Sequence, residues 1–295
     1  MDSRLNNENK YLDLLQRILN EGEKRSDRTG VGTISLFGVI VEYDISESVP
    51  IFTTKKVLWE KVIIELLWIL SGSTNVDILK EKGVNFWNAN VTREFLDGRG
   101  LKHLREGDIG TAYGYQLRHF GAEYKGCDYD YTGCGVDQLK QLIENLKKDP
   151  FSRRHVVSLW NPQQLDEMAL PPCAWSFQVN IVEIEGVRYL DLMLNQRSAD
   201  AFLGLQFNVC SYSFLACIIC NILEIKPRRF IHSIGDAHIY INHIDAVKKQ
   251  LSRKPFPPPT LKFKRKIEDI DNFIFDDFIV ENYKHHSFIK ADMAV

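Results

Sequence analysis

The sequence predicts a single domain of mixed α/β (α+β) structure. Helical and strand-like patterns alternate along all 295 residues, and no linker or internal repeat divides them. A hydrophobic content of 44% and a charged content of 26% are typical of a globular protein, which excludes disordered and collagen-like chains. We therefore expect one domain over residues 1–295.

The first part of the chain predicts a helix, a strand and a second helix. Apolar residues recur at helical spacing over residues 11–19, and Gly22 follows as a stop signal. Alternating apolar residues over 34–43 predict a strand, with Gly38 as a bulge. A long helix is predicted over residues 56–71.

The middle of the chain has no clean periodicity. Residues 84–135 are rich in Gly, Asn, Asp and aromatic residues, which indicates a functional loop region with short helices rather than a separate domain. Helical spacing returns over residues 136–147.

The second half predicts several strands around an apolar helix. A proline-rich stretch, Pro255 to Pro259, ends the last helix and begins a mostly extended tail. The predicted strands are 155–160, 175–182, 187–194 and a strand near 230–234, and the predicted helices are 211–223 and 241–251.

The charge balance excludes a global basic field. The chain has 37 Lys and Arg against 39 Asp and Glu, a formal charge of -2. Nucleic-acid and anionic-membrane surfaces attract proteins through excess positive charge, so any anion site must be local.

Cysteines and apolar runs predict a soluble, cytoplasmic protein. Six cysteines are too few for a disulfide scaffold in a chain of this length. The N-terminus has neither a secretory nor a transit signal. The longest apolar runs, 62–70 and 209–223, carry polar interruptions and fall short of the roughly 20 residues that span a bilayer. We read them as buried core helices.

Cys173 is a candidate nucleophile. It follows Pro171 and Pro172, which fix the backbone, and precedes a predicted strand. A thiolate there could attack a substrate, although a small buried hydrophobe is an equally good interpretation from this position alone. Cys217 and Cys220 lie in an apolar run and are better read as core residues. The remaining cysteines lack partners at zinc spacing, so we expect no metal site.

Arginines supply a candidate phosphate site. Arg28 lies in a glycine-flanked loop, Arg153 and Arg154 precede a strand, and Arg197 with Ser198 follows another. Guanidinium groups and a hydroxyl match a phosphate monoester, whereas each arginine taken alone is better read as a solvated charge or a surface ion pair.

Five further residues have chemistry suited to a site. Glu65 lies in the apolar run 62–70, where burial would raise its pKa toward that of a general acid, or where it could be a boundary residue. Asn208 offers a donor and an acceptor to a pyrimidine edge. Tyr113 is polar in apolar surroundings, and His238 with Tyr240 could hold a sugar hydroxyl; each could instead be structural.

These residues belong to a longer ordered series of motifs, which resembles the thymidylate synthase family over nearly the whole chain. In chain order the motifs are Asp27-Arg28-Thr29-Gly30, Glu65-Leu66-Leu67-Trp68, Trp87 with Asn90, Glu106-Gly107-Asp108, Tyr113-Gly114, Arg118-His119-Phe120-Gly121-Ala122, Arg153-Arg154, Trp160-Asn161-Pro162, Pro171-Pro172-Cys173, Gln196-Arg197-Ser198, Phe207-Asn208, Gly235-Asp236-Ala237-His238-Ile239-Tyr240 and Met293-Ala294-Val295.

The resemblance implies a fold and a reaction. The fold would be a mixed β-sheet covered by helices on one face, with the sheets of two subunits packing in a homodimer. The reaction would convert dUMP to dTMP, with methylenetetrahydrofolate as one-carbon donor and reductant and dihydrofolate as product. No metal, nicotinamide or flavin would be needed.

The resemblance also implies residue roles. Cys173 would attack carbon 6 of the pyrimidine, Glu65 would organise water and move protons, and Tyr113 would support loss of the carbon 5 proton. Asn208 would read the uracil edge, and Asp200 would bind the pterin. The dUMP site would comprise Arg28, Arg197, Ser198, Asn208, His238 and Tyr240, with Arg153 and Arg154 from the partner subunit. The folate site would comprise Phe86, Trp87, Asn90, Asp200, Leu203, Gly204, Phe207, Met293 and Val295, the last two closing over both ligands.

Four positions depart from the family pattern. Ala174 replaces a common His after Cys173, which implies altered water structure. Ala199 replaces a frequent Gly, and Gln206 and Thr111 each replace a frequent Pro. These three changes lie on the folate side, where they could alter loop geometry.

Two alternatives remain open from the sequence. A nucleotide hydroxymethylase of the same fold, acting on dUMP or dCMP, would let water capture the methylene intermediate; Asn208 argues for uracil, and Trp87 would shield that intermediate from water. A protein that chiefly binds RNA is disfavoured by the neutral charge, although Arg228 and Arg229 leave a weak RNA contact open. The sequence also leaves open a nuclear location in addition to the cytoplasmic one.

Overall fold

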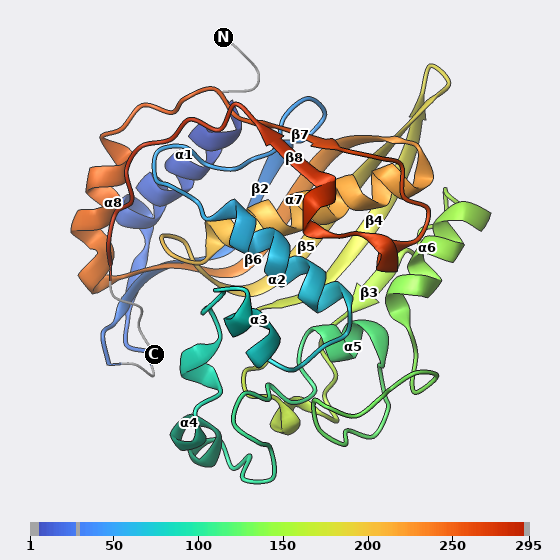
Figure 1. Cartoon of the computed structure of the whole chain (residues 1–295). Helices are drawn as coiled ribbons and strands as arrows, with labels where there is room; N and C mark the ends of the chain where they lie inside the picture. Colours follow the sequence, from blue (N-terminus) through green and yellow to red (C-terminus); the bar gives the residue numbers. More distant parts are fainter. Residues whose placement is uncertain (1–5, 28–29, 292–295) are drawn as a thin grey trace.

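The computed structural model describes residues 6–27 and 30–291, which form one mixed α+β domain (Figure 1). Its centre is a six-stranded sheet with the strand order β1-β2-β6-β5-β4-β3. Among the described strands only β5 and β6 pair in parallel, so the sheet is mixed, as predicted. The strands of this sheet are β1 Glu23–Arg25, β2 Thr33–Asp44, β3 Val156–Ser158, β4 Ala174–Ile184, β5 Val187–Asp200 and β6 Lys226–Tyr240, and a separate pair consists of β7 Thr260–Phe263 and β8 Phe278–Glu281.

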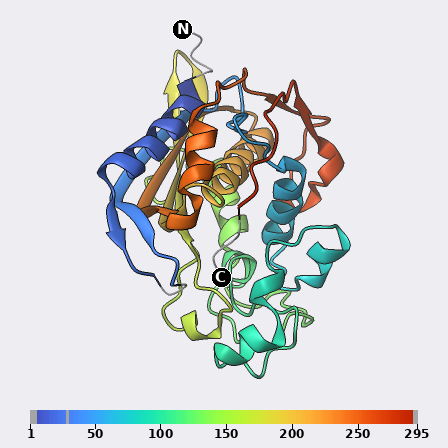
Figure 2. The same cartoon turned by 90° about the vertical axis from the view of Figure 1, so that its left-hand side faces the viewer.

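Helices cover one face of the sheet (Figures 1 and 2). α1 packs on β2 and β6, α7 packs on β5 and β6, and α2 packs on α7. Of the described helices, α7 alone has the length and apolarity of a membrane span, but 72% of it is buried in the protein, as expected of a core helix. The α-helices are α1 Asn6–Glu21, α2 Trp59–Leu70, α3 Asp77–Glu81, α4 Arg93–Gly98, α5 Gly114–Arg118, α6 Gln138–Lys148, α7 Leu205–Leu223 and α8 Ile244–Leu251.

The predicted boundaries of β5 and β6 are wrong. The sequence placed a strand end before Arg197 and gave β6 only five residues, whereas β5 continues to Asp200 and β6 spans Lys226–Tyr240. Polar residues interrupt the apolar alternation in both extensions, but parallel pairing, such as Ser198 opposite Asp236, supports them. α7 likewise begins at Leu205 rather than at 211. These extensions bring several predicted site residues onto adjacent strands.

The central strands share a kink. In β6 the buried apolar residues are even-numbered up to Ile234 and odd-numbered from Ala237. The buried apolar residues make the same change in β2 between Ile34 and Val39, and in β5 between Leu194 and Ala199. Gly38, predicted as a bulge, has a φ of +80° at this point, but β2 keeps its register with β6. At the kink, the backbone of β6 lies very close to β5. A Cβ at Gly235 would lie only 2.7 Å from the Arg197 carbonyl oxygen. The kink therefore sets the position of the Arg197 backbone.

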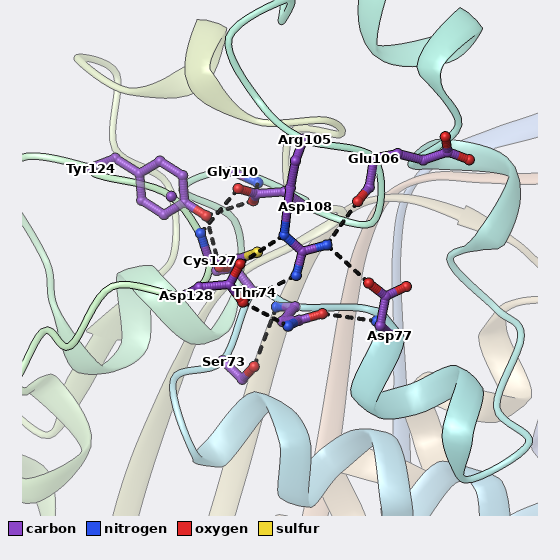
Figure 3. A network of polar contacts seen from close by, with 12 residues as sticks. Ser73, Thr74, Asp77, Arg105, Glu106, Asp108, Gly110, Tyr124, Cys127 and Asp128 are labelled. Atoms are coloured by element: carbon purple, nitrogen blue, oxygen red, sulfur yellow. Dashed lines mark hydrogen bonds and ion pairs between the residues drawn. The ribbon is translucent and has the colours of Figure 1, made fainter.

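Residues 84–135 form the loop region with short helices that the sequence predicts. Trp68 and Trp87 belong to a second buried apolar cluster, which lies beside the main core. A polar network joins its loops (Figure 3). Arg105 binds Asp77 at 2.9 Å and Asp128 at 2.8 Å. Asp108 is buried and accepts hydrogen bonds from the Tyr124 hydroxyl and from the backbone N–H groups of Gly110 and Cys127. This network therefore joins the start of α3 to the loops that carry Arg105, Asp108 and Asp128.

Candidate active site

Cys173 lies at the start of β4, next to Arg197 of β5. The backbone N–H of Arg197 donates to the Cys173 carbonyl at 2.8 Å, and its guanidinium Nη2 lies 3.8 Å from Cys173 Sγ. The same guanidinium donates to the carbonyls of Pro171 and Pro172 at 2.9 and 3.0 Å. A fixed cation beside a thiol favours the thiolate. Cys173 is thus a half-buried thiol with a cation beside it, rather than a thiol packed only among apolar side chains.

Tyr113 also contacts Cys173. Its hydroxyl accepts a hydrogen bond from the Cys173 backbone N–H at 2.9 Å. Tyr113 precedes α5 with a φ of +36°, a conformation that costs a non-glycine residue on the order of 1 kcal/mol. Burial, together with the nearby thiol, holds the pKa of Tyr113 well above its ordinary value. The side chain is therefore a neutral phenol at the nucleophile.

Glu65 points into the site from α2. Its Oε1 accepts a hydrogen bond from Trp87 Nε1 at 2.7 Å. Burial raises the pKa of Glu65 to about 7, although the Trp87 hydrogen bond opposes the shift. A carboxyl with this pKa is populated in both protonation states near neutral pH, as a proton-transferring group requires. Trp87 also packs edge-on against Tyr113, with ring centroids 5.4 Å apart, which connects Glu65 to the Cys173 side.

Asn208 lies in the first turn of α7 and is tied to the sheet. Its Oδ1 accepts a hydrogen bond from Gln196 Nε2 at 3.1 Å. Gln196 Oε1 in turn lies 2.8 Å from His232 Nε2. These three side chains link β6, β5 and α7 beneath the site.

His238 and Tyr240 stand at the end of β6. His238 Nδ1 lies 2.9 Å from Asp236 Oδ1, and Asp236 also binds Arg25 at 2.8 Å. The rings of His238 and Tyr240 are nearly perpendicular, with centroids 5.2 Å apart. Asp236 thus orients His238.

The predicted folate wall is partly assembled around Asp200. Asp200 Oδ1 accepts hydrogen bonds from the backbone N–H groups of Phe202 and Leu203 at 2.9 and 3.0 Å, and its carbonyl accepts from Gly204 at 3.0 Å. The rings of Phe86 and Phe207 lie 5.2 Å apart. Asn90 is buried at 9% exposure in a short helical turn after Trp87.

Several predicted residues are not joined to this cluster. Arg153 and Arg154 lie before β3 at the sheet edge, and within residues 6–27 and 30–291 no hydrogen bond or ion pair connects them to the other site residues. Arg28, Met293 and Val295 lie outside the described residues.

Sequence reasoning missed three side chains at the site. Lys55 is fully buried, donates to the Phe202 carbonyl and lies over the Phe202 ring. Burial lowers the pKa of Lys55 to about 7, whereas the charge of Asp200 raises it. Tyr212 of α7 has a raised pKa because of burial and the charge of Glu65. His232 is the third. Lys55 lies in a bend before α2, and Tyr212 and His232 lie within α7 and β6, so no motif or spacing marks them and only the three-dimensional neighbours identify them.

The structure accommodates the four unusual residues. Thr111 donates its hydroxyl to the Gln164 carbonyl at 3.1 Å, and Ala174 and Ala199 are buried. Gln206 is 2% exposed, and its Oε1 has no hydrogen-bond partner in the described part of the chain.

The site contains no grouped metal ligands. Among the described residues, no three His, Cys, Asp or Glu side chains are arranged to hold a metal ion.

Comparisons with known proteins agree with these features. A family model described as thymidylate synthase matches residues 9–295. A thymidylate synthase from Saccharomyces cerevisiae is 47% identical over 302 residues, which cover 100% of this chain and 99% of the relative. A thymidylate synthase from Homo sapiens is 48% identical over 285 residues, which cover 97% of this chain and 90% of the relative. A bifunctional dihydrofolate reductase-thymidylate synthase from Zea mays is 45% identical over 98% of this chain and 54% of the relative.

Proposed function

Because the chain belongs to the thymidylate synthase family and so methylates dUMP to dTMP, we propose that the residues around Cys173 carry out this reaction. One observation carries the assignment: the Arg197 guanidinium Nη2 lies 3.8 Å from Cys173 Sγ. Methylenetetrahydrofolate is the cosubstrate and supplies both the carbon and the hydride.

Cys173 acts as the nucleophile. Carbon 5 of uracil is a poor nucleophile until a thiolate adds to carbon 6 and turns the ring into an enolate, so covalent addition creates the reactive carbon. The Arg197 guanidinium, held by the Pro171 and Pro172 carbonyls, favours the thiolate.

Glu65 and Tyr113 handle protons. Since the pKa of Glu65 is raised to about 7 by burial, Glu65 can take up and release a proton at the pH of the reaction. Tyr113 keeps its proton because burial raises its pKa, and its hydroxyl supports removal of the carbon 5 proton through ordered water.

The remaining groups bind dUMP. Arg28, Arg197 and Ser198 take the phosphate, together with Arg153 and Arg154 of the partner subunit. Asn208 binds the uracil edge. His238, oriented by Asp236 at 2.9 Å, binds the deoxyribose 3′ hydroxyl with Tyr240.

The folate is bound on the other side. Asp200 binds the pterin, and the wall is formed by Phe86, Trp87, Asn90, Leu203, Gly204 and Phe207. Met293 and Val295 close over the ligands and exclude water from the reactive methylene carbon.

The open face of the sheet supports a homodimer. Phe37 at 85%, Ile40 at 65% and Val156 at 52% are exposed apolar side chains on the face that the helices leave uncovered. Apolar surface of this kind is typical of an interface between subunits. Packing two sheets through it makes Arg153 and Arg154 available to a neighbouring site.

A cytoplasmic location is supported by the thiols. All six cysteines lie in the described part of the chain and form no disulfide, as a reducing compartment requires. Cell fractionation with a specific antibody tests this location.

An RNA contact through Arg228 and Arg229 is not supported. Both guanidinium groups bind Asp191, and Arg229 also binds Glu42. Their charge is therefore already neutralised within the protein.

A product assay tests the proposed function. The protein is incubated with dUMP and methylenetetrahydrofolate, and dihydrofolate formation is followed by absorbance while the nucleotide product is identified by mass. Equal amounts of dTMP and dihydrofolate are expected. Hydroxymethyl-dUMP without dihydrofolate would identify the hydroxymethylase instead.

A further inference from the structure

We propose that Gln196, anchored by the Ser198 carbonyl and by His232, fixes the Asn208 amide in the orientation that accepts uracil and rejects cytosine. Gln196 and His232 are positioning residues that act through Asn208. The proposal rests on the proposed role of Asn208 at the pyrimidine edge.

The Ser198 carbonyl fixes the orientation of Gln196. Gln196 is 3% exposed, and its Nε2 donates to the Ser198 carbonyl at 2.9 Å and to Asn208 Oδ1 at 3.1 Å. A backbone carbonyl can only accept a hydrogen bond, so the amide nitrogen, and not the oxygen, must face it. Both N–H groups of Gln196 are then used, and Oε1 points the other way.

His232 satisfies the remaining oxygen. His232 Nε2 lies 2.8 Å from Gln196 Oε1, and since that oxygen accepts, His232 must carry a proton on Nε2. The ring is fully buried, and its Nδ1 has no partner among the described residues. Burial lowers the pKa of His232 to about 3, so the ring is neutral with a single N–H. His232 therefore holds Gln196 without introducing a charge.

The chain of hydrogen bonds fixes which end of Asn208 faces which partner. Asn208 Oδ1 faces Gln196 Nε2 and keeps one lone pair, while Asn208 Nδ2 has no acceptor in the described part of the chain. A rotation of the amide by 180° would set the NH2 group of Asn208 against that of Gln196. Two donors would then face each other, with neither satisfied.

This orientation matches uracil. Uracil presents an N3–H donor beside the O4 acceptor, which pair with an amide oxygen and an amide NH2 group respectively. Cytosine presents an N3 acceptor beside an amino donor and requires the rotated amide. Because Gln196 blocks the rotation, dCMP would leave buried polar groups unpaired, which is the strongest basis of discrimination between similar ligands.

Selective binding tests the proposal. We would measure the dissociation constants of dUMP and dCMP by calorimetry for the wild type and for Gln196→Met, which keeps the length but removes the donors. The wild type is expected to prefer dUMP strongly. In Gln196→Met the dissociation constant of dCMP divided by that of dUMP should fall by about tenfold or more, because the variant should bind dCMP more tightly. Gln250→Leu, which removes a buried amide bonded to Thr54, is the control and should keep the ratio.

A second pair of variants addresses His232. His232→Leu removes the donor to Gln196 and should lower the ratio by roughly threefold to tenfold, while His232→Gln keeps an N–H and should restore most of it. If Gln196→Met does not fold, the two His232 variants test the positioning role on their own.

The outcomes separate this proposal from the proposed function. An unchanged dCMP to dUMP ratio in Gln196→Met and His232→Leu would overturn the positioning role. Equal losses of both affinities would indicate a merely structural effect and would also overturn it. A wild type that neither binds dUMP nor forms dTMP would instead contradict the proposed function.

Discussion

At the scale of single residues, the site uses burial to set protonation. Burial raises the pKa of Glu65 to about 7 and lowers the pKa of His232 to about 3, so one group titrates near neutral pH and the other stays neutral. The two lie on different elements, α2 and β6. The same desolvation therefore produces a proton-transferring acid in one place and a rigid neutral donor in another.

The raised pKa of Glu65 predicts a pH-dependent cost in stability. The folded carboxyl holds its proton more tightly than the unfolded one, whose pKa is near 4.5, so stability falls as pH rises from about 4.5 to 7. Glu65→Gln removes this cost. Relative to wild type, the variant should gain up to about 3 kcal/mol at pH 8 and little at pH 5, measured by urea unfolding at both values.

The same variant should lose activity. Removing a proton-transferring group reduces kcat by roughly 100-fold or more, and the ionisation near pH 7 should disappear from the kcat profile. A variant with wild-type kcat and an unchanged pH profile would contradict the role of Glu65.

At the scale of elements, the kink across β2, β6 and β5 positions the part of β5 that carries Arg197. Gly235 of β6 approaches Arg197 so closely that a Cβ would lie 2.7 Å from the Arg197 carbonyl oxygen. Arg197 is in turn bonded through its backbone to Cys173 at 2.8 Å. The lack of a side chain at one position of β6 thus sets the spacing of two site residues on neighbouring strands.

Gly235→Ala should therefore weaken dUMP binding. Displacement of the Arg197 backbone should raise the KM for dUMP about tenfold or more and lower kcat as Cys173 shifts. Gly186→Ala is the control. Gly186 has a φ of +77° in the turn between β4 and β5, but no atom lies within 4 Å of a Cβ added there. This substitution should therefore cost about 1 kcal/mol of stability and leave the kinetics unchanged. Equal kinetics for both variants would argue against the kink as a positioning device.

The elements also show what could be predicted from the sequence. Apolar periodicity alone located α2, α7 and the inner parts of β4 and β5, because burial of one face follows directly from their spacing. It failed at the ends of β5 and β6, where Gln196, Ser198 and His238 interrupt the alternation. These polar side chains are near the site, so the pattern is lost where chemistry replaces packing. The sequence offered Cys173 as a nucleophile and Asn208 as a pyrimidine binder beside structural alternatives, whereas the role of Asp200 came only from the family motifs.

At the scale of the whole molecule, the uncovered sheet face and the arginines before β3 point to an active unit of two chains. Arg153 and Arg154 have no bond to the site residues among those described, and Phe37 and Ile40 expose apolar side chains on the sheet face that lacks helices. A dimer through this face would bury the apolar groups and complete the phosphate site. This arrangement could not be predicted from periodicity, since only the three-dimensional sheet shows which face is left open.

A charge on this face should dissociate the dimer. Ile40→Glu, at a position 65% exposed in the single chain, would bury a carboxylate between sheets, so sedimentation should show monomers and kcat/KM should fall at least tenfold. Ile274→Glu is the control, because the Ile274 side chain is also exposed, at 56%, but lies away from the sheet. This variant should keep the wild-type oligomeric state and kcat/KM. A fully active Ile40→Glu monomer would contradict the two-chain site.

The central claim is that the Cys173 thiolate activates carbon 5 of dUMP by adding to carbon 6. The most direct measurement is the release of tritium from dUMP labelled at carbon 5, in the presence of methylenetetrahydrofolate. The wild type should release one tritium for each dTMP formed, and Cys173→Ala, folded as judged by circular dichroism, should release none. Tritium release by Cys173→Ala at the wild-type rate would contradict the account.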